Sequence, residues 1–228
     1  MLDVFCMAME TNLTRPSFKA RCASIKDAQM VYRVIRKQIP YVAHSKAVRE
    51  ASTELMHKKN IWDYLVRRTQ TLLEYREDRA FLNNNFNFYK EILCCAFKEK
   101  IAVCYELSAL TELVLRLNNI QRCAKASLVS KSGQKLNHCV TCVQLSAVFD
   151  PKKTIIIDSF LQDADFLPNM LTKYKNEYKR YLNKIDSCDD IMLDWKKECP
   201  LTENNYAYFK EKYPDLIINR QLFTDKNS

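Results

Sequence analysis

The chain of 228 residues contains a single glycine, Gly133. Glycine most easily adopts the left-handed backbone conformation that tight turns and helix ends require. In this chain most such positions must be filled by Asn, Asp or Ser, which tolerate that conformation less well. Asparagines do cluster at expected boundaries, at residues 83–85 and 118–119. We therefore expect turns and helix ends at these asparagines.

The length and composition indicate one large domain, or one core with an appended subdomain. Hydrophobic residues make up 47% of the chain, which is enough to build a substantial core. The ten cysteines are irregularly spaced, and several fall on apolar faces of predicted helices. There a reduced cysteine behaves as a small hydrophobic residue, so we expect a reducing compartment.

The sequence also predicts a soluble protein. No apolar run approaches the roughly 20 residues that a membrane-spanning helix needs. Residues 1–10 are apolar but lack a basic leader and a small-residue cleavage site, so we expect no classical signal peptide. The net charge of +9 could attract nucleic acid, anionic lipid or acidic protein surfaces, and it does not choose among them.

The first half of the chain has a helical pattern. Apolar residues recur every three or four positions over residues 24–75, where Pro40 interrupts the pattern and predicts at least two helices. A turn is expected at 83–87 and a short helix over 88–97. The clearest helix covers 104–117, with one apolar stripe and a stop at the following asparagines. That stripe comprises Leu107, Leu110, Leu113, Val114 and Leu117.

The hydrophobic period then changes from helical to two, which predicts strands. Beyond Pro168 the chain becomes helical and basic again, with Tyr174, Tyr178 and Tyr181 on one face. A helix followed by an antiparallel meander predicts an α+β fold, with that helix packed on the sheet and further helices flanking it. Strands are expected over 124–130, 136–149 and 154–158, with turns over 131–134 and 150–153.

Three portions follow from this pattern. They are a helical N-terminal portion, 1–85, a core, 86–165, and a helical basic C-terminal portion, 166–228. We expect them to form one compact domain.

Cys104 is the first candidate for chemistry because it opens the 104–117 helix. The positive end of a helix dipole and the nearby backbone N–H groups favour a thiolate, as a nucleophilic cysteine requires. A thiol also needs a proton carrier, and the chain has three histidines. His44 and His57 lie among charged residues of the N-terminal portion, whereas His138 begins the long strand. Asp158 ends the next strand, so antiparallel pairing could place it beside His138.

Four segments resemble the transglutaminase-like superfamily, which shares its Cys-His-Asp arrangement with papain-type enzymes. Residues 101–110, continued by 115–120, resemble the nucleophile helix, in which Glu commonly follows two residues after the Cys. Residues 137–140 resemble the strand that carries the histidine, and 156–159 resemble the strand that ends in Asp. The likeness covers about a third of the chain, from 86 to 165.

The resemblance implies catalytic roles for three residues. Cys104 would be the nucleophile, His138 the general base and acid, and Asp158 the group that orients the imidazole. The fold would then be a transglutaminase-like or papain-like core. The chain departs from the family at Ala102 and Val103, where glycine is common, and it has no counterpart of the aromatic oxyanion donor. The backbone N–H of Cys104 is the natural first donor to an oxyanion, and the second donor stays unidentified.

The resemblance further implies an acyl transferase that modifies glutamine side chains of a protein by transamidation, crosslinking or deamidation, without a cofactor. The chain also resembles effectors that intracellular bacteria inject into host cells. That likeness implies a host protein as substrate, room for a regulatory protein partner, and a path from the bacterial cytoplasm to the host-cell cytoplasm.

Two other functions stay open. The same triad could hydrolyse a peptide or isopeptide bond, which would make the chain a thiol protease. The domain could instead be non-catalytic and serve protein interaction. Asp163 or Asp165 could replace Asp158 as the orienting carboxylate if the strand ends early.

Metal and nucleic-acid binding are not favoured. Cys139 and Cys142 form a CxxC pattern, but on a strand they point to opposite faces and cannot chelate together. Acidic residues are too sparse for a calcium site. The tyrosines beyond Pro168 are expected to pack inward, with lysines around them in solvent, so we expect no nucleic acid as partner.

Overall fold

The computed structural model describes residues 18–42, 63, 85–179, 190–194 and 201–223. At its centre lies an antiparallel five-stranded sheet with the strand order β6-β5-β4-β3-β7. The strands are β3 Cys123–Ser130, β4 Lys135–Gln144, β5 Thr154–Asp158, β6 Asp163–Phe166 and β7 Ile191–Asp194. Mixed helix and antiparallel sheet confirm the α+β class that the sequence predicts.

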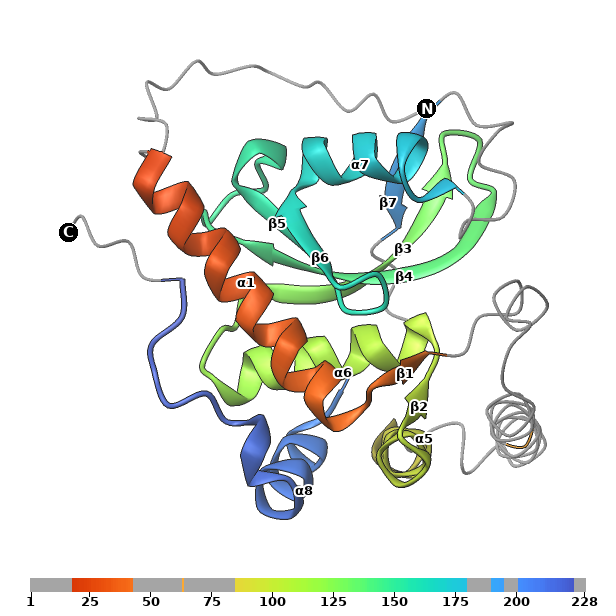
Figure 1. The fold of residues 1–228 in the computed structure, drawn as a ribbon, viewed down its shortest axis with the longest axis vertical. Coiled ribbons are helices and arrows are strands. Elements are labelled where there is room, and N and C mark those ends of the chain that lie inside the picture. The colour runs from red at the N-terminus through yellow and green to blue at the C-terminus, as the bar shows by residue number, and fades with distance from the viewer. Residues whose placement is uncertain (1–17, 43–62, 64–84, 180–189, 195–200, 224–228) are drawn as a thin grey trace, which may run out of the picture.

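Helices cover both faces of this sheet (Figure 1). Helix α7 lies on one face, whereas α6 and α1 lie on the other, and α5 and α8 lie beyond α6. A short parallel pair of two-residue strands, β1 and β2, lies outside the main sheet. The helices are α1 Phe18–Gln38, α5 Asn85–Glu99, α6 Cys104–Leu117, α7 Leu167–Asn176 and α8 Glu203–Lys212, and the short strands are β1 Tyr41–Val42 and β2 Ile101–Ala102. Two 3-10 turns, Pro151–Lys153 and Pro214–Leu216, complete the described elements.

Helix α6 has the bounds that the sequence predicts, and asparagine ends it in place of glycine. The Asn118 side chain donates to the carbonyl oxygen of Val114 at 2.7 Å. Asn119 adopts a left-handed φ of 65°, and the N–H of Ile120 then donates to the carbonyl of Leu115 at 2.9 Å. This reversal closes the helix in the manner that usually needs glycine.

The core consists of two clusters, one on each face of the sheet. The larger cluster contains the predicted α6 residues Leu107, Leu110 and Leu113 together with residues from α1, α5 and α8. The smaller cluster lies under α7 and includes Met170 and Tyr174. Because burying one Leu side chain stabilises a fold by about 1.5–3 kcal/mol, the α6 stripe holds that helix firmly on the sheet.

Several predicted boundaries are wrong. The strand predicted over 136–149 ends at Gln144, which pairs with Thr154, the first residue of β5. Beyond that pair β4 has no partner strand, and Val148 is exposed. Helix α5 begins at Asn85, inside the turn predicted over 83–87. Strands β6 and β7 were not predicted from the sequence. The C-terminal portion is therefore not purely helical, since β7 extends the sheet beside β3.

Helix α1 ends at Gln38, just before Pro40, as the sequence predicts. Within the predicted helical stretch, residues 41–42 form β1 instead of helix. Apart from residue 63, the remainder up to residue 75 lies outside the described residues, as do His44, His57 and Tyr181. Among the helices that are described, none is long and apolar enough to cross a membrane.

Candidate active site

Cys104 is the first residue of α6, and only Val103 separates it from β2. The backbone N–H of Val103 donates to the carboxylate of Glu106 at 3.1 Å, and Glu106 is fully buried. This carboxylate caps the helix at the turn that carries the thiol. The glutamate two residues after the cysteine therefore has a structural role, because it fixes the backbone from which Cys104 projects.

A bulge in β4 faces the start of α6. Ser127 pairs with Cys139 and Val129 pairs with Lys135, so one residue of β3 lies opposite three residues of β4. Within the bulge Asn137 adopts a left-handed φ of 52°. An asparagine tolerates this conformation better than most residues, which suits a chain with almost no glycine.

Cys104 contacts the residue that precedes His138. Its Sγ lies 3.8 Å from the backbone carbonyl oxygen of Asn137, to which it donates. Cys139 follows two residues later on the same strand. The bulge thus brings the thiol of α6 to the segment of β4 that carries the histidine.

The structure brings His138 and Asp158 together, as the pairing of β4 with β5 predicts. The Nε2 of His138 lies 2.6 Å from Oδ2 of Asp158, and both side chains are completely buried. The hydroxyl of Tyr174 donates to the same Oδ2 at 2.8 Å. The backbone N–H groups of Phe160 and Leu161 donate to Oδ1 at 3.1 and 2.9 Å. These donors hold the carboxylate in one orientation.

Asp163 and Asp165, the alternative carboxylates, are engaged elsewhere. The Nζ of Lys173 lies 3.0 Å from Asp163 and 3.3 Å from Asp165. The hydroxyl of Tyr178 also donates to Asp163, at 2.9 Å. Asp158 is therefore the carboxylate that the fold gives to His138.

The second ring nitrogen of His138 is buried, and no described residue hydrogen-bonds to it. The ring is held edge-on by Phe160 and Tyr174, with centroid distances of 5.7 and 5.9 Å. Burying a polar atom without a hydrogen-bond partner costs about 1–3 kcal/mol of folding stability, so the unpartnered Nδ1 requires an explanation. Nδ1 is the atom that would exchange a proton with a thiol if Asp158 holds Nε2.

Electrostatics distinguish the histidine from an ordinary one. Burial alone would lower the pKa of His138, because it penalises the charged imidazolium. The attraction of the Asp158 carboxylate and the hydrogen bond to it outweigh burial and raise this pKa above its usual value.

The prediction that the helix start lowers the pKa of Cys104 is wrong for this arrangement. The hydrogen bond with Cys139 and the burial of its sulfur raise the pKa of Cys104 well above its usual value. The same hydrogen bond, together with Ser127 and the positive charges of Lys125 and His138, outweighs burial and lowers the pKa of Cys139 to about 6. The more acidic thiol of the site is thus Cys139.

Sequence reasoning missed this role of Cys139, because it considered that residue only as half of a CxxC pattern. The available signal was strand alternation, which places Cys139 and Cys142 on opposite faces. Cys142 is buried in the cluster under α7, whereas Cys139 lines the pocket that Tyr105, at the start of α6, also lines. Across the described ranges no group of three or more His, Cys, Asp or Glu side chains could hold a metal ion.

A pocket of about 150 Å³ lies beside these groups. Lys125 gives one wall of the pocket a positive charge. Its Nζ lies 3.5 Å from the ring centroid of Tyr105 and 3.3 Å from the hydroxyl of Tyr89. The lining residues are Tyr105, Lys125, Ser127, Leu128, Lys135, Asn137, His138 and Cys139. A small polar group of a substrate could therefore approach Cys139 and His138 from this side.

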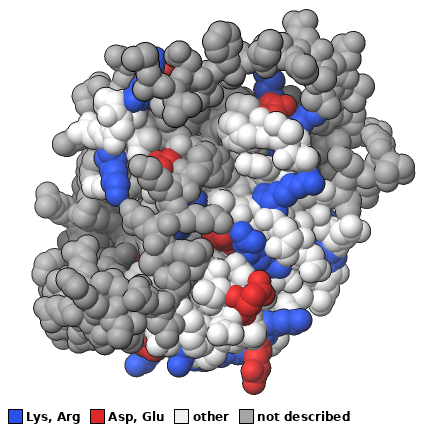
Figure 2. All heavy atoms as spheres, turned by 180° about the vertical axis from the view of Figure 1, so that it is seen from behind, with Lys and Arg blue, Asp and Glu red and all other residues white. Residues whose placement is uncertain are grey.

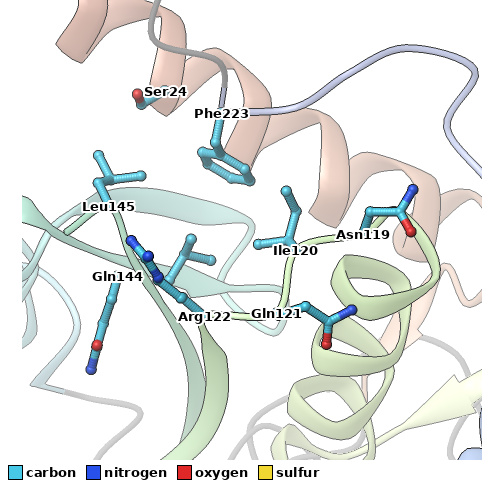
Figure 3. A pocket seen from close by; sticks show the side chains of 9 residues that line it. Ser24, Asn119, Ile120, Gln121, Arg122, Gln144, Leu145 and Phe223 are labelled. Atoms are coloured by element: carbon cyan, nitrogen blue, oxygen red, sulfur yellow. The ribbon is translucent and has the colours of Figure 1, made fainter. Parts of the chain in front are cut away.

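A second pocket, of about 310 Å³, lies at the other end of α6. Its walls come from α1, from the turn after α6 and from the end of β4 (Figure 3). It contains Arg122 and Phe223 but none of the three candidate catalytic residues. It is a separate feature of the surface.

The basic C-terminal portion packs as expected where it is described. Tyr174 is completely buried, and Lys173 pairs with acidic residues of β6. Figure 2 shows Lys and Arg side chains interspersed with Asp and Glu on the described part of one face. That mixture does not resemble the basic stripe expected of a nucleic-acid interface.

Alkylating reagents react with the thiolate, and a thiol with a lower pKa forms its thiolate at lower pH, so the two cysteines should differ. We expect short pulses of iodoacetamide to label Cys139 with a half-maximal rate near pH 6, the pKa that Cys104, Ser127, Lys125 and His138 give it. Cys104 should react only at much higher pH. Peptide mass spectrometry across a pH series measures both rates. Labelling of Cys104 before Cys139 would contradict the assignment.

No family model matches the chain, and comparison with curated proteins and with solved structures likewise found no match. The function must therefore be inferred from the chemistry of the site.

Proposed function

We propose that the chain is a cysteine-dependent acyl transferase of the transglutaminase type, with Cys104 as nucleophile, His138 as proton carrier and Asp158 as the orienting group. The observation that carries the proposal is the buried His138–Asp158 pair, next to the residue of β4 whose carbonyl Cys104 contacts. In the resting structure Nδ1 of His138 has no partner among the described residues, Cys104 included. A helix that begins with the thiol and packs on the histidine strand also supports a papain-like core.

The first step moves the thiol proton. In the resting arrangement Cys104 donates to the Asn137 carbonyl, and its raised pKa keeps it protonated. When substrate displaces this contact, the thiol turns to Nδ1 of His138 and transfers its proton there. The resulting imidazolium is stabilised by Asp158, which accepts from Nε2–H.

The thiolate then attacks the carbonyl carbon of a glutamine carboxamide. The tetrahedral intermediate collapses as His138 gives its proton to the departing nitrogen, so that ammonia leaves and a thioester to Cys104 remains. An incoming amine or water next loses a proton to Nδ1 and attacks the thioester. The C–S bond then breaks, and the Cys104 sulfur leaves and regains its proton from His138. The amine route yields a transamidated or crosslinked protein, and the water route yields a glutamate. No step requires a cofactor.

The substrate class rests on the resemblance seen in the sequence. By that resemblance the acyl donor is a glutamine side chain of a host protein, reached after translocation of the chain as a bacterial effector. A regulatory partner protein would then act on the same site.

Incubation of host-cell extract with purified protein and a fluorescent primary amine tests the proposal. Incorporation of the amine into extract proteins is expected with the wild-type chain, and not with Cys104→Ala. The Arg122→Ala variant, changed in the separate pocket at the far end of α6, is the matched control and should label normally. Cleaved extract proteins without incorporation would instead identify a thiol protease. Neither reaction from a folded chain would favour a non-catalytic interaction domain.

A further inference from the structure

The pocket of about 150 Å³ beside His138 has positively charged walls. Lys125 and Lys135 both line it, together with the polar residues Ser127 and Asn137. Among the described residues that line this pocket, none is acidic. A concave site whose walls carry charge of one sign concentrates ligands of the opposite charge. The pocket is therefore suited to an anionic group.

Lys125 is held at the pocket wall by aromatic side chains. Its Nζ lies 3.5 Å from the ring centroid of Tyr105 and 3.3 Å from the hydroxyl of Tyr89. These contacts fix the position of the ammonium group and do not themselves neutralise its charge. Because the side chain is ordered in advance, binding a ligand costs less conformational entropy than it would with a mobile lysine.

Glu112 of α6 contacts Lys125 at its backbone. Its Oε2 accepts from the backbone N–H of Lys125 at 3.2 Å, and its Oε1 accepts from Nε of Arg116 at 3.1 Å. Both carboxylate oxygens are thus directed to the strand backbone and to Arg116. This carboxylate fastens α6 to β3 and does not line the pocket.

The pocket lies beside the proposed nucleophile. Asn137 lines it, and the carbonyl oxygen of Asn137 lies 3.8 Å from Sγ of Cys104. Consecutive residues of a peptide are about 3.8 Å apart. A peptide whose glutamine reaches Cys104 therefore brings a neighbouring residue within reach of the pocket.

The size and charge of the pocket restrict its occupant. Sites for drug-sized ligands have volumes of about 300–1,000 Å³, so the smaller volume here suits a single side chain. A lysine side chain, the acyl acceptor of a crosslinking reaction, would bring a third ammonium group beside two others, and like charges repel. The group that suits both the volume and the charge is the carboxylate of a short side chain.

We propose that this pocket binds the carboxylate of an Asp or Glu that flanks the acyl-donor glutamine, and that Lys125 and Lys135 select this acidic substrate. The inference rests on the proposed function, which places the glutamine at Cys104. It adds the substrate class, which is a glutamine in an acidic segment of a protein.

Fluorescence anisotropy with two synthetic peptides tests the inference. Each peptide has one glutamine, flanked on both sides by glutamates in the first and by arginines in the second. The full chain carries Cys104→Ala, so that no reaction consumes the peptide during the measurement. The glutamate peptide should bind at least about tenfold more tightly, and added salt should reduce the difference. Equal affinities, or no binding of either peptide, would overturn the proposal.

Lysine variants separate the pocket from the general attraction of a chain with net charge +9. Lys125→Gln and Lys135→Gln should each weaken binding of the glutamate peptide about tenfold, through loss of a charge-assisted hydrogen bond. Lys135→Glu should bind the arginine peptide more tightly than the glutamate peptide. Lys135 is exposed on its strand, so its variants should fold.

Lys152→Gln is the matched control. It removes the same charge from the exposed 3-10 turn before β5, whose first residue pairs with the far end of β4. Its affinity for the glutamate peptide should equal that of the unchanged chain. Unchanged affinity in Lys135→Gln, or an equal loss in Lys152→Gln, would refute a role for the pocket.

Amine incorporation into the same peptides, by chains that keep Cys104, separates this inference from the proposed function. Lys135→Gln should raise KM for the glutamate peptide about tenfold with little change in kcat, because the contact is made equally in the ground state and the transition state. If the lysines select the glutamate peptide but the wild type transfers no acyl group, the pocket stands and the proposed function fails. If the wild type modifies both peptides equally well, the proposed function stands and this inference fails.

Discussion

Replacing Asp158 with Asn should leave the fold intact and lower the rate of acyl transfer about 10⁴-fold. In the structure Oδ2 of Asp158 accepts from Tyr174 and bonds to Nε2 of His138, while Oδ1 accepts two backbone N–H groups. An Asn side chain keeps its oxygen for the two backbone donors. Its NH₂ group then faces Nε2, which must become the acceptor.

The consequence is a change of tautomer. With Nε2 as acceptor, the proton of neutral His138 lies on Nδ1, so the ring can no longer take the proton of Cys104. The variant also loses the carboxylate charge that raises the pKa of His138, while burial, which lowers it, stays. Any remaining activity should therefore have its acid limb at lower pH, because the imidazole stays neutral to a lower pH. Kinetics over a pH series, with circular dichroism for the fold, measure both effects.

Asp163→Asn is the matched control for that variant. Asp163 bonds to Lys173 and Tyr178 and not to His138, so its loss should change stability more than rate. If Asp163→Asn or Asp165→Asn produced the large loss of rate and Asp158→Asn did not, the assignment of the orienting carboxylate would be wrong.

Replacing Cys104 with Ala should abolish acyl transfer, by about 10⁵-fold or to background, because the nucleophile is removed outright. Alanine is a good helix former, and Glu106 still caps α6 through the backbone N–H of Val103, so the fold should persist. Amine incorporation and thermal unfolding measure the two properties.

Cys94→Ala serves as the control for loss of a partly exposed thiol. Cys94 lies near Tyr208 and Lys212, on the contact between α5 and α8, and not in the site. It should keep wild-type incorporation. Retained incorporation in a folded Cys104→Ala chain would mean that another residue is the nucleophile.

The sequence predicts the central elements well, because their signals are local. The apolar stripe and the asparagine stop define α6 within Cys104–Leu117, and a β-branched run defines β5 within Thr154–Asp158. Strand alternation and a short connection then suffice to bring His138 beside Asp158. These features depend on residues close together in the chain.

The missed features depend on residues far apart in the chain. β7 is a four-residue edge strand, and its partner β3 lies some sixty residues earlier. The bulge at Asn137 contacts the start of α6, which lies some thirty residues earlier, and no local pattern reports that contact. The end of β4 likewise depends on where its partner β5 begins.

The pKa values of the two thiols also depend on residues far apart in the chain. The helix position of Cys104 predicts a lowered pKa, but the neighbour supplied by the bulge decides the outcome. The interaction with Cys139 raises the pKa of Cys104, and the same interaction lowers the pKa of Cys139. A pKa set by a contact between β4 and α6 cannot be read from either segment alone.

The central claim is that Cys104 carries the acyl group, and trapping the thioester tests it most directly. The wild-type chain is mixed briefly with host-cell extract without added amine, quenched in acid and mapped by peptide mass spectrometry. We predict an acyl group on the peptide that contains Cys104, removed by hydroxylamine and absent from Cys104→Ala. An acyl group on Cys139, or modification of extract proteins with no acyl group on Cys104, would contradict the account.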